Sequence, residues 1–154
     1  MTTVYRLLCS LYADNPFDGE GAYRYGGRWS SVGTRVAYTS QHQSLAMLEY
    51  FVHLDRDNPP TDLLLARARI PDRLSRIQVP LESLPQDWRS SPSPSALAAI
   101  GDDFVVKCKA AILIVPSALA PAESNWLLNP LHPEFARIEI QPVEPFEYDE
   151  RLFA

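Results

Sequence analysis

Four polar side chains stand inside apolar stretches of this sequence, namely Arg28, Glu49, Asn125 and Asn129. A buried ion costs on the order of several kcal/mol unless it is paired, so core packing alone gives no reason to place an Arg and a Glu in such company. Partly buried polar groups that lie far apart in the sequence are the usual components of an active site. These positions are therefore the first candidates for catalysis or binding.

Arg28 follows Gly26-Gly27 and precedes Trp29. Glycine lets the backbone approach a ligand closely, and a guanidinium presents a planar fork that suits a pyrophosphate or a carboxylate. This pattern favours a ligand-binding turn that includes Gly27 and Trp29. The alternative is an Arg whose stem lies over Trp29 at the surface while its charged head stays in water. The residues alone leave both interpretations open.

Glu49 lies four residues after Leu45 and three before Val52, so on a helix it shares their apolar face instead of facing solvent. A carboxylate in that setting can stabilise a developing positive charge. The structural alternative is a salt bridge to a nearby Arg, for which Arg67 and Arg69 are the candidates. Its place on the apolar face makes Glu49 a stronger functional candidate than Arg28.

Four further side chains have ordinary structural explanations. Tyr38 ends a short predicted strand, where a core Tyr with its hydroxyl at the rim is the commoner outcome. Ser117 follows another predicted strand and would usually cap a turn, and no Gly-x-Ser-x-Gly motif marks it as a hydrolase nucleophile. Asn125 and Asn129 flank an apolar triplet before Pro130, which is typical of a structural turn.

The composition excludes several classes of function. The formal net charge is −5, and nucleic-acid binding needs a basic face that displaces counterions, so we expect no direct contact with nucleic acid. His42, His53 and His132 have no metal-ligand spacing with one another or with Cys9 and Cys108, so we expect no metal site. Two cysteines fit free thiols better than a disulfide framework. Neither a signal peptide nor an apolar run of the ~20 residues of a membrane helix is present, which predicts a cytoplasmic protein.

The elements that must position these side chains follow from hydrophobic periodicity and from breakers. Strands are predicted at Val4–Leu8, Arg35–Thr39, Leu63–Ile70, Ala111–Val115 and Arg137–Val143. Helices are predicted from a Ser44 cap to about His53 and over Ser95–Cys108. Ala13–Gly27 and Pro80–Pro94 are predicted connections, the second anchored by Trp88, and the tail Phe146–Phe153 is predicted to pack along an edge.

The chain has 154 residues, of which 46% are hydrophobic, and this is enough for one core without disulfide or metal support. The apolar residues of the first predicted helix, including Leu45, Leu48 and Val52, indicate packing over much of its circumference. The predicted fold is α+β: one compact domain over residues 1–154, strand-rich, with mixed sheets and a few helices.

The order and spacing of these residues resemble those of the RES-domain family, which is named for its Arg, Glu and Ser. No single motif is specific, but the series extends over most of the chain. It comprises Tyr5-Arg6, Gly26-Gly27-Arg28-Trp29, Gly33-Thr34, Val36-Ala37-Tyr38-Thr39-Ser40, Leu45-Ala46, Leu48-Glu49, Ile100-Gly101-Asp102, Val115-Pro116-Ser117, Glu123, Asn125, Leu128-Asn129-Pro130, His132-Pro133 and Phe146.

The resemblance implies a fold similar to that of ADP-ribosyltransferases and an enzyme that consumes NAD+ as its substrate, with no other cofactor. Members of the family are similar to toxins that degrade NAD+ by hydrolysis or phosphorolysis at the nicotinamide ribose, and one branch modifies a protein instead. The family's Arg, Tyr, Glu and Ser fall on Arg28, Tyr38, Glu49 and Ser117. The implied partner is an Xre-like helix-turn-helix antitoxin, which holds a homodimer of the toxin.

The implied mechanism assigns a role to each of these side chains. Glu49 stabilises the positive charge that builds on the sugar. Arg28 grips the pyrophosphate, and Tyr38 contacts the nicotinamide side. Ser117, with Asn129, orients the ribose or Glu49. Nicotinamide is already cationic in NAD+, so its departure needs no general acid. Two other classes stay open: an ADP-ribosyltransferase that modifies a protein, and a non-catalytic binding module.

Overall fold

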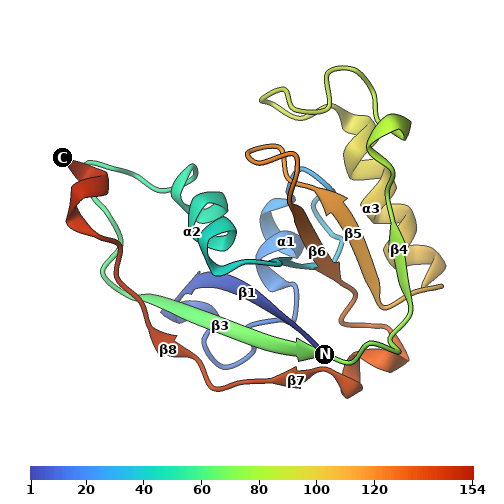
Figure 1. Ribbon diagram of the computed structural model, residues 1–154, viewed down its shortest axis with the longest axis horizontal. Helices are drawn as coiled ribbons and strands as arrows, with labels where there is room; N and C mark the ends of the chain where they lie inside the picture. The colour runs from blue at the N-terminus through green and yellow to red at the C-terminus, as the bar shows by residue number, and fades with distance from the viewer.

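The strands of the chain form one eight-stranded sheet, against which three α-helices pack (Figure 1). This computed structural model describes residues 1–154. The strands are β1 Thr2–Cys9, β2 Ala37–Ser40, β3 Leu63–Ile70, β4 Arg76–Gln78, β5 Ile112–Pro116, β6 Ser124–Leu128, β7 Glu139–Ile140 and β8 Glu144–Pro145. The α-helices are α1 Glu20–Tyr25, α2 Gln43–Phe51 and α3 Ser95–Lys107. None of them combines the length and the hydropathy that crossing a bilayer requires.

The sheet consists of two halves that meet at a single residue pair. Its strand order is β4-β5-β6-β2-β1-β3-β7, with β8 also paired to β3, and only β4 and β5 are parallel. β1 and β3 pair along their whole length, whereas β1 and β2 pair only through Tyr5 and Ser40. The strands diverge beyond that pair, so β1 and β3 run across the direction of β5 and β6 (Figure 1).

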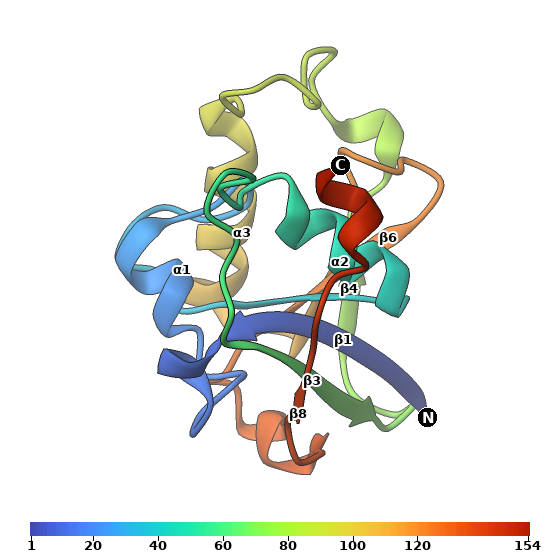
Figure 2. The ribbon, with the colours of Figure 1, turned by 90° about the vertical axis from the view of Figure 1, so that its left-hand side faces the viewer.

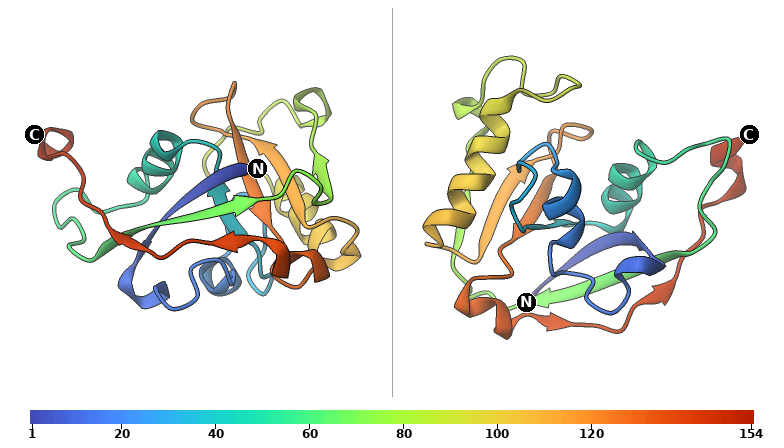
Figure 3. Two further views of the ribbon diagram at one scale, coloured as in Figure 1. Left: turned by 60° about the horizontal axis from the view of Figure 1, so that its bottom comes forward. Right: turned by 180° about the vertical axis from the view of Figure 1, so that it is seen from behind.

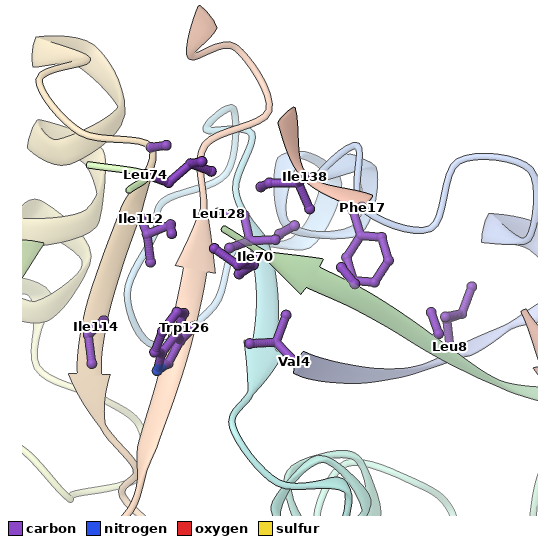
Figure 4. Close-up of a cluster of buried hydrophobic side chains, with 14 residues drawn as sticks. Val4, Leu8, Phe17, Ile70, Leu74, Ile112, Ile114, Trp126, Leu128 and Ile138 are labelled. Carbon is purple, nitrogen blue, oxygen red and sulfur yellow. The ribbon is translucent and has the colours of Figure 1, made fainter. Parts of the chain in front are cut away.

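Buried hydrophobic clusters pack both faces of this bent sheet. The largest contains 14 buried residues, among them Val4, Trp126 and Leu128 (Figure 4). A second cluster of 10 buried residues joins side chains of α3, such as Leu97, to the other face of β5 and β6. A smaller third cluster lies between α2, β1, β3 and the C-terminal tail. The two larger clusters hold β5 and β6 between them, which makes these strands the rigid centre of the fold.

Several sequence-based predictions are confirmed, beginning with the α+β class. The strand predicted at Leu63–Ile70 is β3 with the same boundaries, and the second predicted helix is α3, one residue shorter. The apolar run near residue 112 forms β5, all five residues of which are buried. Trp88 is buried and anchors the long connection before α3, as predicted. Cys9 and Cys108 are free.

Three predicted segments are wrong. The predicted connection Ala13–Gly27 contains α1. Its N-cap is Gly19, whose backbone has the left-handed conformation. The segment around Asn125, predicted as a turn in the structural interpretation, is strand β6, because it pairs with β2 on one side and β5 on the other. Of the predicted strand Arg137–Val143, only Glu139–Ile140 pairs as a strand, since a 3-10 turn over Pro133–Arg137 takes up its start.

Helix α2 differs from the prediction at both ends and on one face. Its N-cap is His42 and not Ser44, and it ends at Phe51. Leu48 and Val52 are 42% and 46% exposed, so the prediction that apolar neighbours cover most of the helix is wrong. The hydrophobic pattern alone does not show which apolar side chains of the helix are covered by other elements of the fold. The side of α2 next to Glu49 is therefore partly open.

The C-terminal tail packs along the sheet edge, as predicted. It also packs onto α2, and Figure 2 shows its final turn beside that helix. A backbone hydrogen bond of 2.9 Å joins Phe146 to β3. The Tyr148 hydroxyl donates to the carbonyl of Met47 in α2 over 2.5 Å, and its ring meets Phe51 edge-on at 5.6 Å between centroids. The tail thus fixes α2, and with it Glu49, against the sheet.

Candidate active site

Helix α2 places the carboxylate of Glu49 beside the adjoining ends of β5 and β6. Ser117, the residue after β5, donates its hydroxyl hydrogen to Oε1 of Glu49 over 2.7 Å. Asn125, in β6, donates from Nδ2 to the same oxygen, also over 2.7 Å. Hydrogen bonds to an ionised acceptor are the stronger kind. Both bonds end on one oxygen of this half-buried carboxylate, so Oε2 stays free of protein donors.

Ser117 is fully buried, and its hydrogen bonds fix where its proton points. The backbone amides of Leu119 and Ala120 each donate to Ser117 Oγ over 3.1 Å. A hydroxyl has two acceptor positions and one hydrogen, so with both acceptor positions used the hydrogen is directed at Glu49. This arrangement makes Ser117 a positioning residue for the carboxylate, in agreement with the absence of a nucleophile motif.

The side-chain amide of Asn125 is oriented by Ser40, which lies directly opposite on β2. The Ser40 hydroxyl donates to Asn125 Oδ1 over 2.7 Å. Because Oδ1 is engaged in this way, Nδ2 must face Glu49, and the hydrogen-bond network leaves only one orientation of the amide. Ser40 and Asn125 are both buried, so water cannot take over either partner. The sequence contained no signal for the role of Ser40.

The salt bridge considered as the structural explanation of Glu49 does not exist. Arg67 pairs with Glu144, and Arg69 pairs with Glu139 over 3.4 Å, both at the far edge of β3. Glu49 has no cationic partner at all. No three His, Cys, Asp or Glu side chains lie together where they would hold a metal ion.

The second part of the site is a tight turn from Gly27 to Ser30. The amide of Gly27 donates to the carbonyl of Ser30 over 2.9 Å, which leaves Arg28 and Trp29 at the tip. The Tyr38 hydroxyl accepts from the Trp29 amide over 3.0 Å and lies 2.8 Å from Ser30 Oγ. A Cβ on Gly27 would stand 2.6 Å from that hydroxyl, so any other residue here would require Tyr38 to shift. Burial raises the pKa of Tyr38 to about 12, and the phenol is neutral.

Arg28 is half-buried and is oriented by one of its terminal nitrogens. Nη1 donates to the carbonyls of Trp88 and Ser90, each over 2.9 Å. No protein acceptor lies at Nε or Nη2. That edge of the guanidinium can bind an anion through two parallel hydrogen bonds, the geometry in which Arg recognises phosphates and carboxylates. Arg28 is therefore not a free surface side chain, because its hydrogen bonds attach it to the connection before α3.

Both parts of the site lie on one face of the sheet. Tyr38 and Ser40 are two residues apart on β2, so their side chains share a face and their Cα atoms are separated by about 7 Å. Asn125 is directly opposite Ser40 and shares that face. Figure 3, right, shows the connection between α1 and β2 lying between α2 and α3. The fold therefore brings Arg28, Tyr38 and the Glu49 network to one side of β2 and β6.

The structure removes two predicted residues from this site. Trp29 is 2% exposed and its ring belongs to the core cluster under α3, so only its backbone amide faces Tyr38. Asn129 is fully buried beyond the opposite end of β6, four residues or about 13 Å from Asn125. Its Oδ1 accepts from the amide of Leu131 over 3.0 Å. The turn interpretation is therefore correct for Asn129.

One cation near the junction of the two half-sheets, Arg6, belongs to the series that carries the family resemblance but was given no role from the sequence. Arg6 follows Tyr5, the residue at which β1 leaves β2, and its buried Nε has no hydrogen-bond partner. Burial lowers the pKa of Arg6, and nearby Asp18 opposes that effect. A buried donor nitrogen without an acceptor costs about 1–3 kcal/mol. An Arg within the apolar strand Val4–Leu8 was the available signal.

Comparisons with known proteins give a family model, sequence relatives and a solved structure with a similar fold. A model of the RES domain matches residues 3–149. A protein of Pseudomonas putida named "Toxin Res" is 40% identical over 146 residues, which cover 94% of this chain and 96% of that protein. A protein of Sphingobium sp. named "Prs ADP-ribosylating toxin" is 32% identical over 144 residues, 92% of this chain and 89% of that protein. A chain in the crystal structure of the M. tuberculosis MbcT-MbcA toxin-antitoxin complex has a similar fold, with a TM-score of 0.76 and 16% identity over 99% of this chain and 86% of that chain.

Proposed function

The chain belongs to the RES-domain family, and from that premise we propose that it is the toxin of a toxin–antitoxin pair and that it cleaves the bond between nicotinamide and ribose in NAD+. The observation that carries this proposal is the carboxylate of Glu49, which Ser117 and Asn125 hold through one oxygen while the other stays free. NAD+ is the substrate, and the proposed reaction uses no other cofactor.

Cleavage of the nicotinamide–ribose bond suits a carboxylate such as Glu49, whose charge is not neutralised by a cationic side chain. When the bond from C1′ of the ribose to the nicotinamide nitrogen breaks, its electron pair leaves with nicotinamide, which becomes neutral. The sugar is left with positive charge, as in glycoside cleavage. A carboxylate fixed beside the sugar stabilises that charge without having to reorganise. Water or phosphate then adds at C1′, and one proton is released.

The supporting side chains keep Glu49 in place during this step. Two hydrogen bonds of 2.7 Å to Oε1 stop the carboxylate from rotating, so Oε2 is the oxygen that faces the substrate. A preorganised group of this kind contributes more than a mobile one because it loses no freedom when the charge develops. Ser117 takes no covalent part, since its oxygen already accepts from two amides.

The turn with Arg28 holds the other part of NAD+. Its free Nε–Nη2 edge binds the pyrophosphate, which is an anion of the right shape for a planar fork. The Tyr38 hydroxyl is already engaged by Trp29 and Ser30, so the ring of Tyr38 and not its hydroxyl contacts the nicotinamide side.

The acceptor of ADP-ribose defines the main alternative, transfer to a protein. The Sphingobium relative, 32% identical, is named for ADP-ribosylation, and transfer would use the same carboxylate.

We propose an Xre-like helix-turn-helix antitoxin as partner of a toxin homodimer in the cytoplasm. The net charge of −5 supports this assignment, because DNA contact by the pair would then fall to the antitoxin.

Purified protein incubated with NAD+ carrying a label on adenosine tests this proposal. Free nicotinamide with an equal amount of free labelled ADP-ribose supports hydrolysis, and labelled ADP-ribose 1″-phosphate in phosphate buffer supports phosphorolysis. Label on protein, in the purified sample or in an added cell extract, supports transfer instead. Intact NAD+ under all three conditions would overturn the proposal and leave the binding module.

A further inference from the structure

Helix α3 contributes no side chain to the site, yet one of its carboxylates holds the segment that follows the Arg28 turn. Asp102 Oδ1 accepts from the amide of Ser31 over 2.9 Å and from Thr34 Oγ1 over 2.8 Å. Asp102 Oδ2 accepts from Ser31 Oγ over 2.6 Å. Burial alone raises the pKa of Asp102, but the hydrogen bonds from Ser31 and Thr34 outweigh it and keep the pKa below its usual range.

The neighbouring residue brings the backbone of α3 into direct contact with the same turn. An added Cβ on Gly101 would stand 1.6 Å from the carbonyl oxygen of Trp29 and 2.8 Å from its carbonyl carbon. The helix therefore touches the turn at Trp29 and binds it at Ser31. These two points lie on either side of Ser30, whose hydroxyl meets Tyr38.

The contacts of Asp102 are more specific than the attachment of a helix to a core requires. Leu97 and Phe104 already bury the core face of α3. The next residue, Asp103, shows the ordinary case of a surface carboxylate, since it pairs only with Lys107 within the same helix. Asp102 instead joins a segment 71 residues away and uses both of its oxygens there.

We propose that Asp102 is a positioning residue for NAD+: it fixes the Gly27–Thr34 segment so that the free edge of the Arg28 guanidinium meets the pyrophosphate. This inference rests on the proposed function, because it assigns NAD+ to the site. A misplacement of about 1 Å can cost about 100-fold in kcat/KM. Because Asp102 holds the residues that follow Arg28, it governs how well the Arg28 guanidinium binds the pyrophosphate. Arg28 contacts the pyrophosphate before and during the reaction, which means that the effect falls on KM and not on kcat.

Three variants of the full chain separate positioning from general stability. Asp102→Ala removes all three hydrogen bonds. Asp102→Asn keeps the shape, since its amide nitrogen can donate to Ser31 Oγ while its oxygen still accepts from the Ser31 amide. Asp103→Ala is the matched control, because it removes the neighbouring surface carboxylate of the same helix. For each variant the measurements are NAD+ turnover, hydrogen exchange of residues 27–34 and a melting curve.

We expect Asp102→Ala to raise KM for NAD+ by about tenfold or more with kcat changed by less than about threefold. Its residues 27–34 should exchange faster, whereas Asp102→Asn and Asp103→Ala should resemble the wild type in both measurements. Unchanged KM and unchanged exchange in a folded Asp102→Ala variant would overturn the inference. A lower melting temperature with unchanged KM would do so as well, because it would show a purely structural role. A wild-type protein that leaves NAD+ intact would overturn the proposed function, and hydrogen exchange would still show whether Asp102 fixes the segment.

Discussion

Substitution of Gly101 by Ala should destabilise this protein, although the same substitution stabilises most helices. Ala is favoured over Gly inside a helix by about 1 kcal/mol, because Gly loses more backbone freedom on folding. At position 101 the added methyl group would stand 1.6 Å from the carbonyl oxygen of Trp29. Both atoms belong to the backbone or are fixed to it, so no flexible side chain can move aside.

The size of the effect follows from that distance. The contact must open from 1.6 Å to 3.0 Å, so either α3 or the Arg28 turn must move by about 1.4 Å. Overpacking of this kind costs about 1–3 kcal/mol, which exceeds or cancels the gain in helix propensity. The net loss is therefore up to about 2 kcal/mol, which lowers the melting temperature of a chain of this size by up to about 8 °C. If the turn is the part that moves, kcat/KM for NAD+ should fall by up to about 100-fold, and the change should lie mainly in KM, as for Asp102→Ala.

Gly21→Ala is the matched control, because Gly21 is also helical and its added Cβ would meet nothing closer than 3.6 Å. We expect that variant to melt at or above the temperature of the wild type. Melting curves and NAD+ turnover for both variants complete the comparison. The reasoning would be refuted if Gly101→Ala also melted at or above the wild-type temperature with full turnover.

Three further predictions concern the site itself. Arg28→Ala should weaken NAD+ binding by about 10–100-fold, the range for a lost hydrogen bond to a charged group, and calorimetry that finds unchanged affinity would remove Arg28 from the site. Ser117→Ala should lower the free energy of unfolding by about 1–3 kcal/mol, because two partly buried amides lose their acceptor and Glu49 loses a donor, and a loss near zero by denaturant titration would contradict the network. Burial raises the pKa of Tyr38 to about 12, so the unfolded phenol, at about 10, loses its proton first and stability falls as pH rises from about 10 to 12. Tyr38→Phe should lose less stability over that interval, and equal losses in both proteins would show that Tyr38 does not titrate there.

The sequence predicted those parts of the fold that depend on local pattern. Strand β3 alternates arginines with apolar residues from Ala66 to Ile70 and is closed by Pro71, and β5 is a short apolar run, so both were evident. Strand β6 was missed because its first two residues, Ser124 and Asn125, are polar and look like a turn until the neighbouring strands pair with them. Pairing partners from distant segments leave no local trace in a single sequence.

The site was predictable only where a polar residue stood out against apolar neighbours. Glu49 could be found in this way, whereas Ser40 could not, because a Ser beside a predicted strand looks ordinary and its partner Asn125 lies 85 residues away. Asn129, like Asn125, is a polar residue among apolar neighbours. The two differ only in place: Asn125 lies near the start of β6 and Asn129 follows its end. Residue type and periodicity therefore identify candidates, while the fold decides which of them meet.

The most direct test of the account is the effect of Glu49→Gln on turnover and on NAD+ affinity. The Gln side chain keeps the shape, and its oxygen can still accept from Ser117 and Asn125, but the charge that faces the sugar is lost. Because that charge acts on the transition state and the ground-state sugar carries little positive charge, we predict a turnover reduced by about 10²–10³-fold with nearly unchanged NAD+ affinity. A folded Glu49→Gln variant with wild-type turnover would contradict the central claim that this carboxylate stabilises the breaking of the nicotinamide–ribose bond.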